Sequence, residues 1–234
     1  LTYILAGFFV TLGEVYIHEN LGPPTPLPKS SKRHFGLIQG IGMWWHLQIY
    51  SVLLRAYISR KTIVVSQEIK DTLISLWHYP SKKVLVKYHG VDLGCYRPFA
   101  EIRSKMRDAL KISPDETVII VAARLSKEKC IHRTIEAFDV LCRQFPHMSL
   151  WILGEGLLEN DLKSLAQNMA SSNKIRFLGH IDNVADYLKM SDIYVLSSDN
   201  EGFGIVLIEA MATGLVCVST RCPGPGEIIQ DGKN

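Results

Sequence analysis

The sequence has no internal repeat and no low-complexity segment, and cysteine is scarce in it. Its five cysteines are odd in number, and no two of them stand in C-x-x-C spacing. These features argue against a disulfide framework and against a zinc site, and they favour the reducing cytoplasm as the location. Peripheral contact with the inner or cytoplasmic face of a membrane is left open.

A large excess of charge of one sign is also missing. The 234 residues are 47% hydrophobic and 21% charged, with a net charge of +3, which is typical of a globular domain. The charge is uneven, because residues 1–105 hold 13 Lys and Arg against 6 Asp and Glu, whereas residues 106–234 hold 13 against 17. The basic first part suits contact with anionic lipid or an acidic acceptor, and a solvated basic surface explains it equally well.

One long apolar stretch, residues 35–58, contains a single charged residue, Arg55. Its length approaches that of a membrane span. Polar residues and glycines interrupt it, namely Gln39, His46, Gln48, Ser51, Gly36, Gly40 and Gly42. We therefore interpret the stretch as a buried or interfacial helix rather than as a span.

Strand and helix patterns alternate along the chain. The first part predicts strands at 15–17, ending at His18, and at 62–66 and 83–88, with helices at 67–77 and 103–110. The second part predicts strands at 118–123, 150–153, 175–178, 193–196 and 216–219, and helices at 132–145, 157–170, 184–190 and 204–213. Strands joined by helices through short loops specify a parallel, doubly wound α/β sheet. We predict two domains, 1–98 and 99–234.

Polar residues or glycines follow each of the five strands predicted in the second part. In open α/β sheets ligands bind beyond the carboxyl ends of the strands, so these residues form the candidate site. They are Arg124 and Lys129, Gly154-Glu155-Gly156, Gly179-His180, the loop 197–202, and Thr220 followed by Gly224-Pro225-Gly226-Glu227.

Each of these features also has a purely structural interpretation. Arg124 and Lys129 suit a diphosphate, because Arg offers bidentate geometry and Lys a compact charge, but taken alone they are more typical of a surface pair. Gly202 and Gly204 open a helix whose free N–H groups favour an anion or sugar oxygens, or they form a plain turn. His180 is alternatively an ordinary loop histidine, and Gly154-Glu155-Gly156 a turn. Glu227 is alternatively a charge in the first turn of a helix, where the helix dipole favours it.

Two glutamates, Glu201 and Glu209, are separated by seven residues. Glu209 lies in an otherwise apolar helix, where a carboxylate is costly unless another group pairs with it. A polyhydroxyl ligand at the mouth of the sheet would be such a partner. A buried salt bridge is the structural alternative.

Taken in order, these residues resemble the donor domain of the family 4 (GT4) retaining glycosyltransferases, which have the GT-B fold. The segments His89-Gly90-Val91-Asp92 and Tyr96-x-Pro98 resemble the hinge of that family, and the resemblance covers about residues 62–232. The motifs that carry it are Ala123-Arg124-Leu125 with Lys129, Gly154-Glu155-Gly156, Phe177-Leu178-Gly179, Ser198-x-x-Glu201-Gly202-Phe203-Gly204 and Glu209-Ala210-Met211-Ala212-x-Gly214.

The resemblance implies an α/β protein of two Rossmann-like domains. The sequence begins at Leu1 and ends at Asn234 in a turn-like run, so we expect a fragment with a truncated N-terminal domain and a C-terminal domain that lacks its last elements. The implied enzyme moves a sugar, with retention, from a nucleotide-diphosphate sugar to a glycan or lipid-linked acceptor in cell-envelope polysaccharide or glycolipid synthesis. It implies no metal, no cofactor and no nucleic-acid partner.

The same resemblance assigns three catalytic residues, Arg124, Lys129 and Glu201. The two cations would neutralise the departing diphosphate, and Glu201 would lie beside the donor sugar. In the usual mechanism of such enzymes, the leaving phosphate oxygen takes the proton of the acceptor through an oxocarbenium-like state on one face of the sugar. Electrostatic stabilisation of the leaving group then carries most of the catalysis.

Donor-binding roles follow by resemblance for several other residues. The backbone of Phe203, Gly204 and Ile205 would bind sugar or phosphate oxygens, and Glu209 would accept hydrogen bonds from the ribose hydroxyls. Gly179 and His180 would border the base. His18 resembles a histidine that lines the cleft from the N-terminal domain, with a structural histidine as the alternative.

Three residues depart from the pattern of the family. Its members usually have Gly at the positions of Ala123 and Cys130, and Asn at the position of His89. Cys130 is expected to alter the Lys129 loop, because a positive φ is cheap only for Gly.

Two other functions are compatible with such a fold. A glycan synthase or phosphorylase would share the fold, but related phosphorylases carry a pyridoxal-phosphate lysine for which the sequence offers no candidate motif. A non-catalytic nucleotide-sugar-binding module is the other rival, and the intact set of Arg124, Lys129, Glu201 and Glu209 argues against it.

Overall fold

The computed structural model describes the backbone of residues 16–18 and all of residues 59–234. The chain divides into two compact units, Leu1–Tyr88 and His89–Asn234, which are described separately. The interpretation of residues 35–58 concerns residues outside the described ones. The predicted boundary between residues 98 and 99 stays a prediction.

The first unit contains a small parallel sheet of three strands, β1 (Tyr16–His18), β2 (Thr62–Val64) and β3 (Val84–Val86), in the order β1-β2-β3. Helix α3 (Gln67–Ser75) joins β2 to β3. Strand β2 is shorter than the predicted 62–66, because Ser66 has become the N-cap of α3 and accepts a hydrogen bond from the Ile69 N–H at 3.3 Å. A 3-10 turn, Ser81–Lys83, precedes β3.

The second unit contains a sheet of five parallel strands in the order β6-β5-β4-β7-β8. These strands are β4 (Thr117–Ala122), β5 (Met148–Leu153), β6 (Ile175–Gly179), β7 (Ile193–Leu196) and β8 (Val216–Ser219). The predicted parallel α/β sheet is therefore confirmed. The order matters for function, because it makes the loops that follow β4 and β7 neighbours at the carboxyl edge of the sheet.

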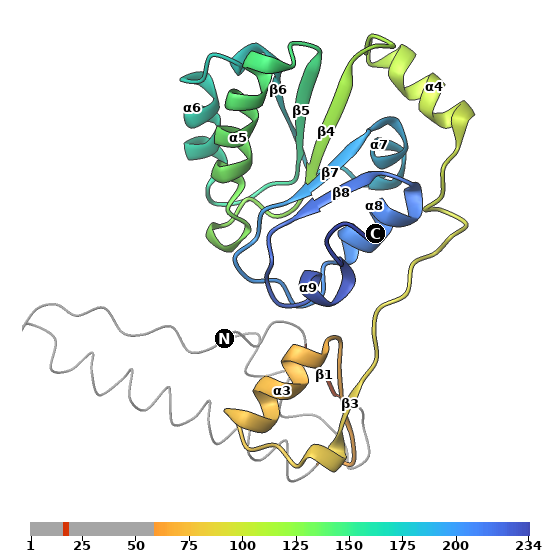
Figure 1. Cartoon of the computed structure of the whole chain (residues 1–234), viewed down its shortest axis with the longest axis vertical. Helices are drawn as coiled ribbons and strands as arrows, with labels where there is room; N and C mark the ends of the chain where they lie inside the picture. The colour runs from red at the N-terminus through yellow and green to blue at the C-terminus, as the bar shows by residue number, and fades with distance from the viewer. Residues whose placement is uncertain (1–15, 19–58) are drawn as a thin grey trace, which may run out of the picture. The chain divides into compact units, whose positions relative to one another are not determined.

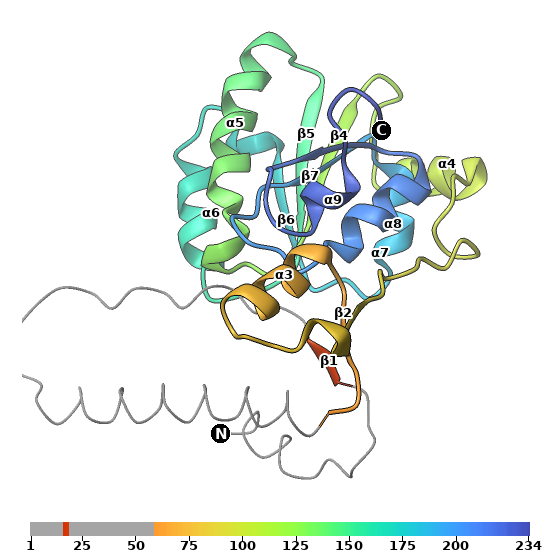
Figure 2. The ribbon, with the colours of Figure 1, turned by 60° about the horizontal axis from the view of Figure 1, so that its bottom comes forward.

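Helices cover both faces of this sheet (Figures 1 and 2). Helices α5 (Ile131–Gln144) and α6 (Glu159–Gln167) lie on one face, and α7 (Val184–Met190) and α8 (Ile205–Thr213) lie on the other. The core is correspondingly double, since Ile119 and Val121 pack on the first side while Ile120 packs on the second. Alternate side chains of a strand point to opposite faces, and this explains the division.

The remaining helices differ from the sequence prediction in detail. Helix α4 (Ala100–Ala109) begins three residues earlier than predicted, with Phe99 as its N-cap residue. Helix α6 is shorter than the predicted 157–170. The turn predicted around Gly224 contains a one-turn helix, α9 (Pro225–Ile228), in which Pro225 occupies the first helical position, where it is favoured.

Cys217 lies inside an apolar strand pattern that predicts a small core residue, and the structure confirms this only in part. The residue packs against the core on the α8 side but is only half-buried. Its neighbours Val216 and Val218 are 64% and 53% exposed. The reason is that β8 lies at the edge of the sheet, so its outer face is covered less than that of a central strand.

Candidate functional site

The candidate site lies where β4 and β7 end. Strand β4 leads into the loop that carries Arg124 and Lys129, and β7 leads into the loop that carries Glu201. The two strands are direct neighbours in the sheet. Residues that are more than seventy positions apart in the sequence therefore come together at one edge, as the fold rule for open α/β sheets requires.

Lys129 and Glu201 form an ion pair, in which Nζ of Lys129 lies 2.5 Å from Oε2 of Glu201. Their side chains are only 17% and 16% exposed. Charged groups withdrawn from water to this degree need a partner, and each supplies one to the other. Two of the three predicted catalytic residues are thus in direct contact.

Arg124 lies on the same loop as Lys129 but is exposed. Within the described residues its side chain makes no hydrogen bond and no ion pair. Hydrogen bonds, led by one from the Ser126 side chain, lower the pKa of Glu128, and the charges of Lys129 and Arg124 act in the same direction. The loop therefore presents one cation that is already paired and one whose guanidinium is available to a ligand.

Cys130 has a backbone conformation that favours glycine, which is the residue that the resembled family usually has at this position. Its φ is 48° and its ψ is 37°, which is left-handed. It is buried, at 3% exposed, and immediately precedes helix α5, whose N-terminus receives no side-chain cap from it. A non-glycine residue pays about 1–2 kcal/mol for this conformation, so other contacts must hold the Lys129 loop in place.

The loop after β7 supplies several of those contacts. The hydroxyl of Ser197 donates to the carbonyl oxygen of Lys129 at 2.9 Å, and the N–H of Asp199 donates to the carbonyl oxygen of Glu128 at 2.9 Å. The Asp199 carboxylate also pairs with Arg133 of α5 at 2.5 Å. The loop after β4 that carries Arg124 and Lys129 (the cation loop) and the loop after β7 that carries Glu201 (the acid loop) are therefore joined by both backbone and side-chain contacts.

Gly154 and Gly156 lie where the loop after β5 closely approaches the backbone of the loop after β4. A Cβ on Gly154 would lie 2.0 Å from the carbonyl oxygen of Ala123, and a Cβ on Gly156 would lie 2.3 Å from that of Leu125. No side chain fits at either position. This finding favours the structural interpretation of Gly154-Glu155-Gly156, in which the two glycines let the loops after β4 and β5 pack backbone to backbone.

The acid loop leads into α8 through a left-handed glycine. Gly204 has a φ of 91° and is the N-cap residue of α8. Phe203 is buried, at 6% exposed, and its ring lies 5.7 Å from that of His89, whereas Ile205 is 41% exposed. The first N–H groups of α8 have no partner within the helix and are therefore suited to bind oxygen atoms of a ligand.

Glu209 is half-buried in the middle of α8, and the structure answers the question of its partner. Burial raises the pKa of Glu209, and a side-chain hydrogen bond from Tyr96 acts in the opposite direction. Burial and the nearby Glu209 carboxylate together raise the pKa of Tyr96 to about 12. Among the described residues no basic side chain pairs with Glu209, so the buried salt bridge considered from the sequence is not found there.

The predicted base-binding residues lie at the end of β6, which is separated from β4 by β5. Gly179 has a φ of 68°, and the His180 N–H donates to Oε1 of Glu155 at 3.3 Å. The His180 ring is exposed and lies 3.1 Å from Asp182. The local contact is compatible with an ordinary loop histidine, and a role at the base stays a prediction.

His18 is the last residue of β1 in the first unit. Because the two units are described separately, its predicted position in a cleft stays a prediction. Sequence reasoning gave no role to Ser197 and placed Tyr96 only in a hinge motif. Nothing in the sequence marks their contacts with Lys129 and Glu209, since these contacts arise only when the chain has folded.

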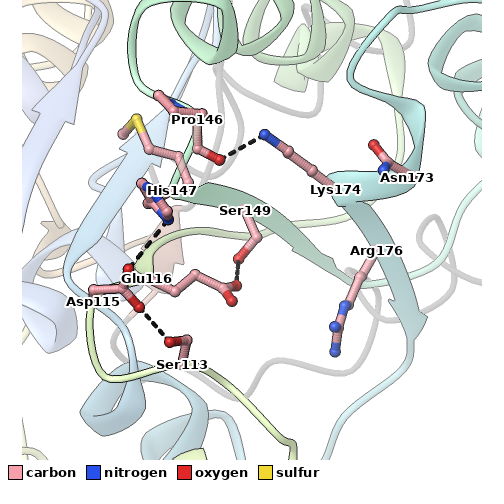
Figure 3. A pocket seen from close by; sticks show the side chains of 10 residues that line it. Ser113, Asp115, Glu116, Pro146, His147, Ser149, Asn173, Lys174 and Arg176 are labelled. Atoms are coloured by element: carbon pink, nitrogen blue, oxygen red, sulfur yellow. Dashed lines mark hydrogen bonds and ion pairs between the residues drawn. The ribbon is translucent and has the colours of Figure 1, made fainter.

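A pocket of about 330 Å³ lies at the opposite, amino-terminal edge of the sheet, before β4, β5 and β6 (Figure 3). Its polar groups are largely paired with one another, as Asp115 is with His147 at 3.2 Å and Glu116 is with Ser149 at 2.5 Å. The residues predicted from the sequence do not line it. The candidate site therefore stays at the carboxyl edge, where the loops of β4 and β7 meet.

In residues 59–234 no cluster of three or more His, Cys, Asp or Glu side chains has the arrangement of a metal site. The expectation that the enzyme requires no metal stays a prediction. None of the helices in that part of the chain combines the length and apolar character needed to cross a membrane.

The fold and the strand-end residues define an α/β protein with an open, parallel, doubly wound sheet. Residues 102–234 match the family model of the glycosyl transferases group 1. The chain belongs to this family.

Similar proteins agree with this assignment. The chain is 31% identical over 183 residues to N-acetyl-alpha-D-glucosaminyl L-malate synthase of Bacillus anthracis, covering 77% of this chain and 47% of that protein. It is 35% identical over 128 residues to the lipopolysaccharide core biosynthesis glycosyltransferase LpsE of Rhizobium meliloti, covering 55% of this chain and 36% of that protein. The chain thus spans at most about half the length of these curated relatives.

The fold is also that of solved glycosyltransferases. The crystal structure of Anabaena Alr3699/HepE in complex with UDP and glucose superposes with a TM-score of 0.76, at 22% identity, over 93% of this chain and 55% of that chain. The predicted GT-B type of α/β fold is therefore confirmed.

Proposed function

We propose that this chain is the donor-binding part of a retaining GT4 glycosyltransferase. The enzyme transfers a sugar from a nucleotide-diphosphate sugar to a glycan or lipid-linked acceptor. The single observation that carries the proposal is the Lys129–Glu201 ion pair at the carboxyl ends of β4 and β7. Arg124, on the same loop as Lys129, has no side-chain partner among residues 59–234. A cation and an acid are thus held together where α/β sheets bind ligands.

The chemistry of these groups fits a diphosphate leaving group. The Arg124 guanidinium can bind two phosphate oxygens at once, and the Lys129 ammonium supplies a compact charge. Both are cations that become more stabilising as negative charge develops on the departing diphosphate, which is the basis of electrostatic catalysis. Glu201, already 2.5 Å from Lys129, would then face the donor sugar.

In the proposed mechanism the acceptor attacks the same face of the sugar from which the diphosphate departs. A phosphate oxygen of the leaving group takes the proton of the acceptor hydroxyl, so this chain needs no general base. The N–H groups of Phe203, Gly204 and Ile205 would bind phosphate or sugar oxygens at the start of α8. This route explains why cations rather than a base dominate the candidate site.

The nucleoside would lie along the edge of the sheet. Glu209 would accept from the ribose hydroxyls, and Gly179 with His180 would border the base. A carboxylate has two oxygens and can accept from several donors, so the hydrogen bond from Tyr96 leaves Glu209 with acceptor capacity for the ribose.

For the acceptor we propose a cell-envelope glycan or glycolipid, made in the cytoplasm or at the cytoplasmic face of the membrane. Support comes from the basic composition of residues 1–105 and from the similarity to a relative that acts in lipopolysaccharide core biosynthesis. A basic surface attracts anionic lipids and would hold such an enzyme near its acceptor.

Donor cleavage by the full-length protein tests the proposal. The release of nucleoside diphosphate from UDP-, GDP- and ADP-sugars should be detectable for the wild type, and a pure binding module would release none. Lys129→Ala should lower the rate by about a hundredfold, because it removes a cation that stabilises the leaving group.

The matched control is Lys189→Ala. Lys189 is an 8% exposed lysine that pairs with Asp186 at 2.9 Å, on helix α7 away from the candidate site. The Lys189→Ala variant therefore removes a similarly buried, paired lysine that does not contact the proposed donor. If both variants cleave the donor at the wild-type rate, the site assignment is wrong.

A further inference from the structure

Lys129 is held at two points by the loop that follows β7. The hydroxyl of Ser197 donates to the carbonyl oxygen of Lys129 at 2.9 Å, and the Lys129 ammonium pairs with Glu201 at 2.5 Å. Between them, the N–H of Asp199 donates to the carbonyl oxygen of Glu128 at 2.9 Å. Alternate residues of one loop thus fix both the backbone and the side-chain end of the lysine.

This support from the loop after β7 adds to a short 3-10 turn, Lys127–Lys129, in which the Lys129 N–H donates to the carbonyl oxygen of Ser126 at 3.1 Å. The next residue, Cys130, is a left-handed non-glycine residue with a φ of 48°. It also gives no side-chain cap to the helix it precedes. A backbone that is unfavourable at this point keeps its geometry only when neighbouring contacts determine it.

Of these contacts, the Ser197 hydroxyl is the one that acts directly on the Lys129 backbone through a side chain. Ser197 is 8% exposed and directly follows the last residue of β7, so its position is set by the central sheet. A short side chain on a rigid element holds its partner more precisely than a long side chain on a loop. The bond fixes where the Lys129 side chain begins.

We propose that Ser197 is a positioning residue that aims the Lys129 ammonium at the donor diphosphate. This inference rests on the proposed function. Ser197 acts through Lys129 and touches no part of the donor. Its loss should therefore weaken the stabilisation of the transition state, where Lys129 acts, more than the binding of the donor itself.

The experiment compares Ser197→Ala with Ser191→Ala in the full-length protein. Ser191 is 3% exposed, and its hydroxyl donates to the carbonyl oxygen of Tyr187 at 2.8 Å. It lies shortly before β7, whereas Ser197 lies immediately after it. The control therefore removes the same kind of buried bond at the far end of the same strand. A third variant, Ser197→Thr, keeps the hydroxyl.

The readouts are kcat and the donor KM for release of nucleoside diphosphate from UDP-, GDP- and ADP-glucose, together with the melting temperature. Ser197→Ala should lower kcat about tenfold with a donor KM within about twofold of the wild type, because a small misplacement of a catalytic group is costly. Ser191→Ala should lose a similar amount of melting temperature and keep kcat. Ser197→Thr should recover most of kcat.

A kcat for Ser197→Ala that matches that of Ser191→Ala would overturn the inference. If Ser197→Ala does not fold, the threonine variant decides: near wild-type kcat supports the inference, and a folded protein with lost turnover rejects it. A wild type that cleaves none of the three donors rejects the proposed function itself. Cleavage by the wild type that Ser197→Ala leaves unchanged rejects only the role of Ser197.

Discussion

At the scale of single residues, the Lys129–Glu201 pair combines two charged groups that are both less than one-fifth exposed. Withdrawing each from water costs free energy, and the attraction between them offsets that cost only while both are present. Each group therefore orients its partner before a donor arrives. The arrangement is preorganised for an anion, which would find the ammonium already in place.

Tyr96 tunes the carboxylate that we propose binds the ribose. Burial raises the pKa of Glu209, and the hydrogen bond from Tyr96 lowers it. In Tyr96→Phe only the burial effect is left, so the pKa of Glu209 should rise. Because the ionised carboxylate is the acceptor, nucleotide affinity should then be lost at a higher pH than in the wild type as the pH falls.

The measurement is the dissociation constant for UDP, GDP and ADP across the acidic pH range. Besides Tyr96, the titratable side chains that interact with Glu209 or with its partner are Tyr194 of β7, Cys95 and Asp92, and the variant leaves all three in place. Tyr187→Phe is the control, since Tyr187 packs on the same core without acting on Glu209. If nucleotide affinity falls at the same acidic pH in Tyr96→Phe as in the wild type, this role is contradicted.

Single residues were predicted from the sequence with uneven success. The sequence placed Lys129 and Glu201 after strands of one parallel sheet, but their pairing was not predicted, because it depends on β4 and β7 being neighbours in the folded sheet. The left-handed backbone at Cys130 followed from the glycine expected there. The hydrogen bonds made by Ser197 and Tyr96 could not be predicted, because serine and tyrosine hydroxyls carry no periodic signal that names their partners.

At the scale of elements, the turn between β8 and α9 packs closely against the backbone of the acid loop. Gly224 has a φ of 78°, and a Cβ there would lie 2.6 Å from the Cα of Phe203. Gly226, two residues later, has open space around the position of a Cβ. The same substitution at these two positions therefore separates close packing from the general effect of adding a methyl group.

Gly224→Ala should lower the free energy of unfolding by about 2 kcal/mol, because it combines a left-handed backbone with a backbone clash. It should also displace Phe203 and weaken nucleotide binding. Gly226→Ala lies inside α9 and should leave stability unchanged or raise it by about 0.5 kcal/mol. Urea unfolding of both variants checks this, and equal stabilities would refute the close-approach argument.

Elements with strong periodicity were predicted best. The strands of the second sheet and helix α7 lie where the hydrophobic pattern placed them, within a residue or two. The ends of helices were less certain, because tertiary contacts decide them. Helix α9 was missed, since a four-residue helix within a Gly-Pro run resembles a plain turn in sequence.

At the scale of the whole molecule, the α/β class followed from alternation of strand and helix patterns, and family membership followed from ordered motifs at the strand ends. The specificity for base, sugar and acceptor does not follow from either. Those choices depend on loops and on parts of the enzyme that curated relatives have and that this chain does not span.

The central claim is that a nucleotide diphosphate binds where β4 and β7 end, between the cations and the acids. The most direct measurement is the melting temperature of the full-length protein with UDP, GDP or ADP and their sugars. At about a hundred times the dissociation constant, one of these nucleotides should raise the wild-type melting temperature by about 5 °C, and the rise should vanish when Lys129→Ala is combined with Glu209→Gln. No rise with any of the nucleotides, or an equal rise in the double variant, would contradict the account.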